Sequence, residues 1–194
     1  MTSARGPLPK FDDVYLEIAL RLISRHGRVG RKHLAKELGI GEGSVRTIIR
    51  KLKEKGLISS ARGGHFLTAA GRKRLEKEIF VEVDARELSV GKVSVATVVR
   101  GGSKFVKSGI EQRDEAIKVG ADGATVLLCR KGELVFPGDF VKVNSQIAKE
   151  LMKILRPKDG DVVIIGSGKN SIMAEAGTRA AAKSLSSKLA TTQA

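Results

Sequence analysis

The sequence predicts an α+β protein with two domains, residues 1–79 and residues 80–194. Two contrasting patterns point to this class. The N-terminal part carries apolar residues at helical spacing in three consecutive segments, followed by two short strands around a glycine-rich turn. The C-terminal part alternates β-branched runs with amphipathic segments. A mixed polar stretch over residues 82–92 separates the two patterns, so we place the domain boundary within residues 80–88.

The composition fits a globular protein and argues against several classes of function. Of the 194 residues 41% are hydrophobic, which is enough apolar content for a packed core. The single cysteine, Cys129, excludes an intramolecular disulfide, and with three histidines it argues against a closed Cys/His zinc site. No apolar run approaches the roughly 18–20 residues that span a bilayer. We therefore expect a cytoplasmic protein with no membrane partner, no bound metal and no cofactor.

The charge is unevenly distributed along the chain. The whole sequence has 36 Lys and Arg against 21 Asp and Glu, a net charge of +15. Residues 1–79 hold 18 basic and 8 acidic residues, a net charge of +10, whereas the longer remainder has a net charge of +5. A strong basic excess predicts a polyanionic partner, and its position assigns that partner to the N-terminal domain.

Three helices are expected first. Asp12 and Asp13 are placed to cap a helix that ends before Gly27, and a second helix spans residues 31–38. The third covers residues 42–55 and ends at Gly56, where a left-handed backbone costs glycine little. Its apolar positions recur at three- and four-residue spacing, and they are Val45, Ile48, Ile49 and Leu52.

A hairpin and a fourth helix follow. Residues 57–60 and 65–67 read as two short strands around Arg62-Gly63-Gly64, whose glycines tolerate the positive φ of a tight turn. Thr68 then caps a basic helix that extends to about Ile79. We expect His65 to be an ordinary hydrogen-bonded strand residue.

This order of helices, hairpin and helix resembles the winged helix-turn-helix domain. The segment from Gly41 to Ile58 is similar to its recognition helix running into the wing, and the string LTAAGRKRLE after the hairpin fits as well. The resemblance implies double-stranded DNA as the partner, with the third helix in the major groove. Arg46 and Arg50 would read guanines, with a contact to phosphate or solvent as the alternative for each, and Ser44 and Lys51 would hold phosphates. The expected DNA-binding residues are Gly43, Ser44, Arg46, Thr47, Arg50, Lys51 and Arg62.

The C-terminal elements predict a two-layer α/β sandwich. Strands are expected over residues 93–100, 124–129, 133–136 and 161–165, and helices over 109–119, 145–155 and from about 171. This order is that of a split βαβ fold. If Phe80 to Val83 is also a strand, the layout becomes ββαββα. The last helix is rich in alanine and glycine, small residues that let an element of the same chain or of a second copy approach closely, so we expect a homodimer.

Residues 163–171 partly match a phosphate-binding loop. A Walker loop needs glycine and Ser or Thr where this chain has Val163 and Asn170, which argues against nucleotide hydrolysis. The surviving hypothesis is a site for a small anionic effector at a helix start, and the alternative is a plain strand-to-helix turn. The candidate anion-binding residues are Gly166, Ser167, Gly168 and Lys169.

No catalytic constellation emerges, so we expect no enzyme activity. The carboxylates Glu111, Asp114 and Glu115 share one helix with basic neighbours, which is typical of a salt-bridged surface. Cys129 lies inside an apolar strand and is expected to be an inert buried thiol.

Nearly the whole chain resembles an archaeal family of small winged-helix, regulator-like proteins with a C-terminal domain of unknown function. The resemblance depends on residues 108–118 and 123–125, on Phe136-Pro137 and on residues 159–164. It implies a transcriptional regulator whose C-terminal domain dimerises, senses an anionic ligand, or both. The alternative is a non-regulatory RNA- or ribosome-associated protein, because winged helices also serve such roles.

Overall fold

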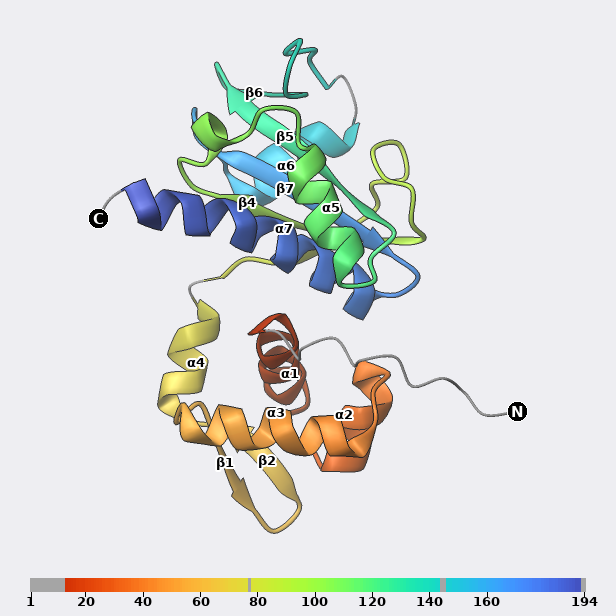
Figure 1. Cartoon of the computed structure of the whole chain (residues 1–194), viewed down its shortest axis with the longest axis vertical. Coiled ribbons are helices and arrows are strands. Elements are labelled where there is room, and N and C mark those ends of the chain that lie inside the picture. Colours follow the sequence, from red (N-terminus) through yellow and green to blue (C-terminus); the bar gives the residue numbers. More distant parts are fainter. Residues whose placement is uncertain (1–12, 77, 144–145, 193–194) are drawn as a thin grey trace. The chain divides into compact units, whose positions relative to one another are not determined.

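The computed structural model describes residues 13–76, 78–143 and 146–192, and it divides into two compact units between Glu78 and Ile79. The fold is mixed α+β, with helices in the N-terminal unit and an antiparallel sheet in the C-terminal unit (Figure 1). This coarse fold class was predicted from the sequence. Among the described residues, no helix has the length and apolarity that crossing a membrane requires.

The first three helices closely match the predicted ranges. They are α1 (Asp13–His26), α2 (Arg31–Leu38) and α3 (Glu42–Glu54). The predicted apolar face of α3 is buried over Val45, Ile48, Ile49 and Leu52. Gly39 and Gly56, which follow α2 and α3, both have the positive φ that favours glycine. Asp12, the other expected cap of α1, lies outside the described residues.

The hairpin is formed by β1 (Ile58–Ala61) and β2 (Gly64–Leu67), with Arg62 and Gly63 at its turn. A third segment pairs with it, because the Val29 and His65 amides donate to each other's carbonyls at 3.0 and 2.8 Å. A Cβ atom at Gly64 would lie 2.7 Å from the Val29 carbonyl carbon, so this close pairing requires glycine.

Helix α4 (Ala69–Glu76) follows Thr68, the predicted cap, but ends before Ile79. The Thr68 hydroxyl accepts a hydrogen bond from the Gly71 amide at 3.1 Å, which caps the helix. The same hydroxyl donates to the Gly56 carbonyl at 2.7 Å. Thr68 thus ties the start of α4 to the end of α3 and fixes the base of the hairpin.

The C-terminal unit is built on a five-stranded sheet in the order β3-β4-β7-β5-β6, in which every neighbouring pair is antiparallel. The strands are β3 (Val81–Val83), β4 (Val93–Val99), β5 (Gly123–Arg130), β6 (Glu133–Val135) and β7 (Val162–Gly168). Strands β4 and β5 run in the same direction, with β7 inserted between them. Helix α5 (Ile110–Lys118) connects them, so the predicted split βαβ unit is present.

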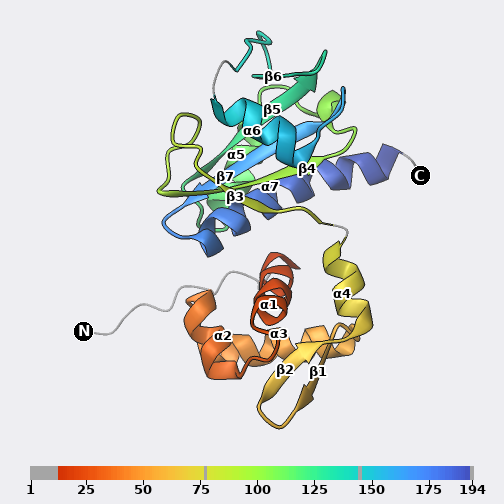
Figure 2. The ribbon, with the colours of Figure 1, turned by 180° about the vertical axis from the view of Figure 1, so that it is seen from behind.

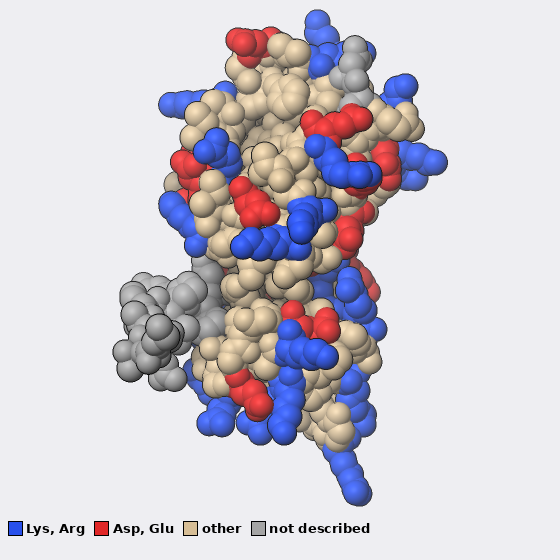
Figure 3. All heavy atoms as spheres, turned by 90° about the vertical axis from the view of Figure 1, so that its right-hand side faces the viewer, with Lys and Arg blue, Asp and Glu red and all other residues tan. Residues whose placement is uncertain are grey.

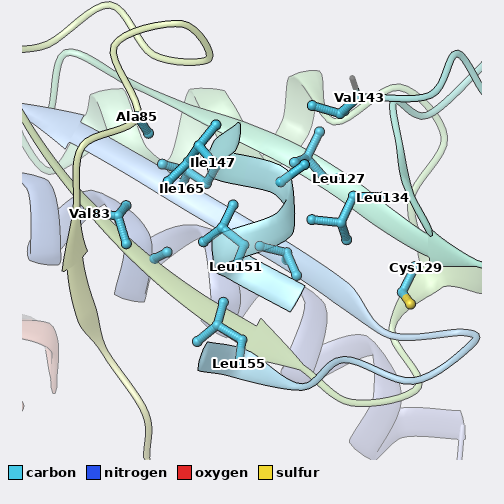
Figure 4. Packing of buried hydrophobic residues seen from close by; sticks show 13 residues of the cluster. Val83, Ala85, Leu127, Cys129, Leu134, Val143, Ile147, Leu151, Leu155 and Ile165 are labelled. Atoms are coloured by element: carbon cyan, nitrogen blue, oxygen red, sulfur yellow. The ribbon is translucent and has the colours of Figure 1, made fainter. Parts of the chain in front are cut away.

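The predicted two-layer arrangement is wrong, because helices cover both faces of this sheet. Strand β7 sends Val162 and Ile164 into a core with α7 (Ser171–Thr192), and Val163 and Ile165 into a second core with α6 (Gln146–Leu155). Helices α5 and α7 lie on one face, and Figure 2 shows α6 on the other. In Figure 4 the side chains of α6 point toward the sheet. A strand buried on both faces needs a helix on each side, which makes three layers.

Strand β3 exists within the segment considered for it, so the chain follows the alternative ββαββα order and then continues into β7 and α7. Its three residues pair with β4 from Val81 opposite Ala96 to Val83 opposite Ser94. A short 3-10 turn, η1 (Ser103–Phe105), lies between β4 and α5.

Candidate nucleic-acid interface

The outer face of α3 carries the residues that the sequence predicts to contact DNA. Gly43, Arg46 and Arg50 are exposed, whereas Thr47 is half-buried on the same side. Ser44 and Lys51 are also half-buried and flank this face. The structure therefore brings the six α3 residues together on one helix, opposite its buried positions.

The two arginines of this face differ in their surroundings. Arg50 Nη1 lies 2.6 Å from Glu54 Oε1, and both side chains are more than half exposed. Among the described residues, Arg46 has neither an ion pair nor a hydrogen bond to its side chain. The Arg46 guanidinium is therefore not engaged by a side chain of the described residues, whereas the Arg50 guanidinium is paired with the Glu54 carboxylate.

Arg62, the seventh predicted residue, is exposed at the hairpin turn. The turn is held from outside the hairpin by Arg28, whose Nη1 donates to the Arg62 carbonyl at 3.0 Å. The Arg28 guanidinium also lies 5.3 Å from the centre of the Phe66 ring. Sequence reasoning missed Arg28, since a contact across 34 positions leaves no local pattern.

His65 marks where three elements meet. Its Nδ1 lies 2.6 Å from the Ser60 hydroxyl across the hairpin, as expected for a hydrogen-bonded strand residue. Partial burial lowers the pKa of His65, and the positive charges of Lys53 on α3 and Arg31 on α2 lower it further. Arg31 and Lys53 were not predicted as site residues, yet their charges act on the hairpin.

Basic side chains are therefore concentrated around the hairpin. Figure 3 shows Lys and Arg gathered over the end of the N-terminal unit that carries it. Two arginines of α4 bond within the unit. Arg74 donates from Nε and Nη2 to Glu17, which raises the pKa of Arg74. Arg72 Nη1 donates to the Leu67 carbonyl at 3.1 Å.

The predicted loop at residues 166–168 is in fact the end of β7, and this corrects our interpretation of its glycines. Gly166, Ser167 and Gly168 are buried and pair with β4, and Gly166 and Ser167 also pair with β5. A Cβ atom at Gly166 would lie 2.6 Å from the Ala174 carbonyl oxygen, so the glycine lets α7 lie directly on the strand. Glycine is needed there for packing.

What remains of the predicted anion site is the turn between β7 and α7. Lys169 is exposed, and the Asn170 side chain accepts a hydrogen bond from the Met173 amide at 2.9 Å, so the helix start already has a cap. Anion binding at Lys169 stays a prediction.

The small residues of α7 pack within the chain, since Gly177 faces Ala121 and Ala116. The predicted homodimer likewise stays a prediction.

Two of the three carboxylates of α5 form the predicted surface ion pairs, whereas Asp114 forms none among the described residues. Lys118 lies 2.5 Å from Glu115, and Lys188 of α7 lies 2.5 Å from Glu111. Cys129 is buried, and burial raises the pKa of its thiol. Within the described ranges, no three His, Cys, Asp or Glu side chains are grouped so as to hold a metal ion.

Comparisons with known proteins match each unit to a family. Residues 17–73 match a family described as the PH0730-like N-terminal domain, and residues 90–185 match a domain of unknown function, DUF4443. The chain is similar to the solved structure of the hypothetical protein PH0730 from Pyrococcus horikoshii OT3. The two are 36% identical with a TM-score of 0.67, over 89% of this chain and 93% of that one. A search of curated proteins finds no match.

Proposed function

This chain belongs to the PH0730-like family of archaeal proteins, and we propose that its N-terminal unit is a winged helix that binds double-stranded DNA in a transcriptional regulator. The observation that carries the proposal is the exposed basic face of α3, with a hairpin next to it that carries an exposed arginine at its turn. In this proposal α3 enters the major groove and the hairpin is the wing. The C-terminal unit is then the part available for dimerisation or effector binding.

Six of the seven predicted residues have a role that their positions support, whereas the Thr47 hydroxyl donates to the Gly43 carbonyl of α3 itself at 3.4 Å. Arg46 and Arg50 lie one helical turn apart on the exposed face, where a guanidinium fork suits O6 and N7 of guanine. Gly43 has open space beside it, which permits close approach of the duplex. The half-buried Ser44 and Lys51 flank the face, as phosphate contacts do. Arg62 is exposed at the tip of the wing, where it would contact a minor groove or the adjacent phosphate.

Alanine variants separate base reading from phosphate binding. Arg46→Ala is expected to cost about 1–3 kcal/mol on a selected duplex and much less on random DNA, because only the selected site offers the right base. Lys51→Ala should weaken binding to both duplexes alike and make binding less steeply salt-dependent. Lys149→Ala, an exposed change on α6, is the matched control. Fluorescence anisotropy over a salt series measures all three.

Two outcomes would contradict the proposal. Equal losses for Arg46→Ala on selected and random DNA would remove its base-reading role. Mapping of the bound protein in cells tests the regulatory part. Discrete peaks at promoters support it, whereas co-purification with RNA or ribosomes and no such peaks would favour the RNA-associated alternative.

A further inference from the structure

An open cleft lies within the C-terminal unit at the end of β5, and none of the predicted anion-binding residues lines it. Its volume is about 560 Å³, inside the range of roughly 300–1,000 Å³ typical of small-molecule sites. Four segments distant in sequence form it: η1 and the residues after it, the end of β5, the loop after β6, and the turn before β7. The side chains that matter here are Lys104, Lys107, Arg130, Phe140 and Asp159.

The cleft is positively charged. Lys104, Lys107 and Arg130 are exposed, and among the described residues none of them forms an ion pair with a carboxylate. The one carboxylate of the lining is Asp159, which leaves a net charge of +2. Asp159 is engaged in shaping the chain, because its two oxygens accept hydrogen bonds from the Lys131 and Gly132 amides at 3.0 and 2.9 Å. Three cations around one cleft, with no carboxylate partner in the described part of the chain, favour an anionic ligand.

The cleft also presents a flat surface. Phe140 is 47% exposed, and its φ of +53° lies in the left-handed region that bulky residues rarely adopt. An aromatic side chain that is exposed and held in this backbone conformation does not stabilise the fold. The Arg130 guanidinium carbon lies 4.3 Å from the centre of the Phe140 ring, so the two planar groups are held together at the rim. Planar ligands stack on such groups.

We propose that this cleft binds a nucleotide, with the base stacked on the Phe140 and Arg130 pair and the phosphates bound by Lys104 and Lys107. A charged phosphate and a planar base together account for both features of the lining, whereas a simple anion accounts only for the lysines. Cys129 also lines the cleft, and burial raises the pKa of its thiol. In the proposed regulator this would be the effector site, and in that sense it rests on the proposed function.

Calorimetric titration of the full chain without DNA tests the site, so its result is separable from that of the DNA-binding experiment. The probes are ATP, AMP, adenosine and inorganic pyrophosphate. We expect ATP and AMP to bind and adenosine to bind much more weakly. Lys104→Ala combined with Lys107→Ala should weaken ATP binding at least tenfold, because each lysine offers charge-assisted hydrogen bonds.

Phe140→Ala is the decisive variant. Loss of a stacked base weakens binding by about fivefold or more, so Phe140→Ala should reduce AMP affinity and leave pyrophosphate binding unchanged. Lys149→Ala combined with Lys153→Ala removes the same charge from the exposed side of α6 and serves as the control. All substituted side chains are exposed, and equal melting temperatures would verify that the variants fold.

Three results would overturn the proposal. One is the absence of ATP and AMP binding at millimolar concentration. Another is an equal loss of ATP affinity in the cleft variant and in the control, which would indicate attraction to the net charge alone. The third is tight binding of a single-stranded oligonucleotide with no binding of mononucleotides, which would make the cleft a contact for a nucleic-acid chain.

Discussion

Exchanging Glu54 for glutamine is expected to tighten the proposed DNA binding, because this carboxylate holds one of the two arginines on the outer face of α3. Arg50 Nη1 lies 2.6 Å from Glu54 Oε1, and the side chains are 61% and 57% exposed. An exposed pair one helical turn apart contributes only about 0.3–0.5 kcal/mol, since water and salt screen it. Arg50 gives up that energy when it turns to the duplex. Removing the pair therefore corresponds to about a twofold gain in affinity.

The assay is a double-mutant cycle measured by fluorescence anisotropy on one selected duplex at fixed salt. The four proteins are the unsubstituted chain, Glu54→Gln, Arg50→Ala and the double variant. If the gain comes from the freed arginine, it is absent in the Arg50→Ala background, and the coupling energy is about 0.3–0.5 kcal/mol. Glu76→Gln, an exposed change near the end of α4, makes the same change in net charge and serves as the control.

Two results would refute the reasoning. An equal gain with and without Arg50 would mean that Glu54 merely repels phosphates. No gain in either background would mean that Arg50 makes no contact with the duplex, and the base-reading role would then be left to Arg46 alone.

Two further predictions concern stability. The pKa of His65 is lowered in the folded state, so the unfolded chain takes up the proton first as the pH falls. The free energy of unfolding should therefore decrease as the pH drops below about 6.5 and on through the folded-state pKa. Chemical denaturation over a pH series should show this slope, and His65→Gln should reduce it. Gly166→Ala should lower the free energy of unfolding by about 1–3 kcal/mol through overpacking against α7. Gly123→Ala, whose Cβ would lie 3.7 Å from Val90 and near no other described atom, is the control and should leave the stability nearly unchanged. Thermal melts of both variants measure this effect.

Local patterns explain what the sequence predicted well. The helices of the N-terminal unit follow from apolar spacing and from glycines at their ends, and both are properties of adjacent residues. The Thr68 cap and the hairpin turn are likewise encoded within a few positions. The layer arrangement of the C-terminal unit is different, because the side of the sheet on which a helix packs depends on pairing between strands far apart in the chain.

The strand-to-helix segment at residues 163–171 shows how a local pattern misleads. Glycines after a strand favour a loop, yet here they extend β7, because α7 crosses so closely that a side chain would strike its backbone. The same sequence string is compatible with both structures. Only the position of α7, which follows from packing against the whole sheet, decides between them.

Net charge is a poor guide to where a partner binds, and the N-terminal unit makes the reason clear. Its basic excess includes cations engaged within the fold, such as Arg74 on Glu17 and Arg28 on the hairpin turn. These side chains stabilise the frame and have little freedom to contact a ligand. Arg46 on α3 and Arg62 at the hairpin turn are exposed and have no carboxylate partner among the described residues. Composition does not reveal which cations are engaged within the fold, whereas the structure shows that Arg46 and Arg62 are not paired with a carboxylate of the described residues.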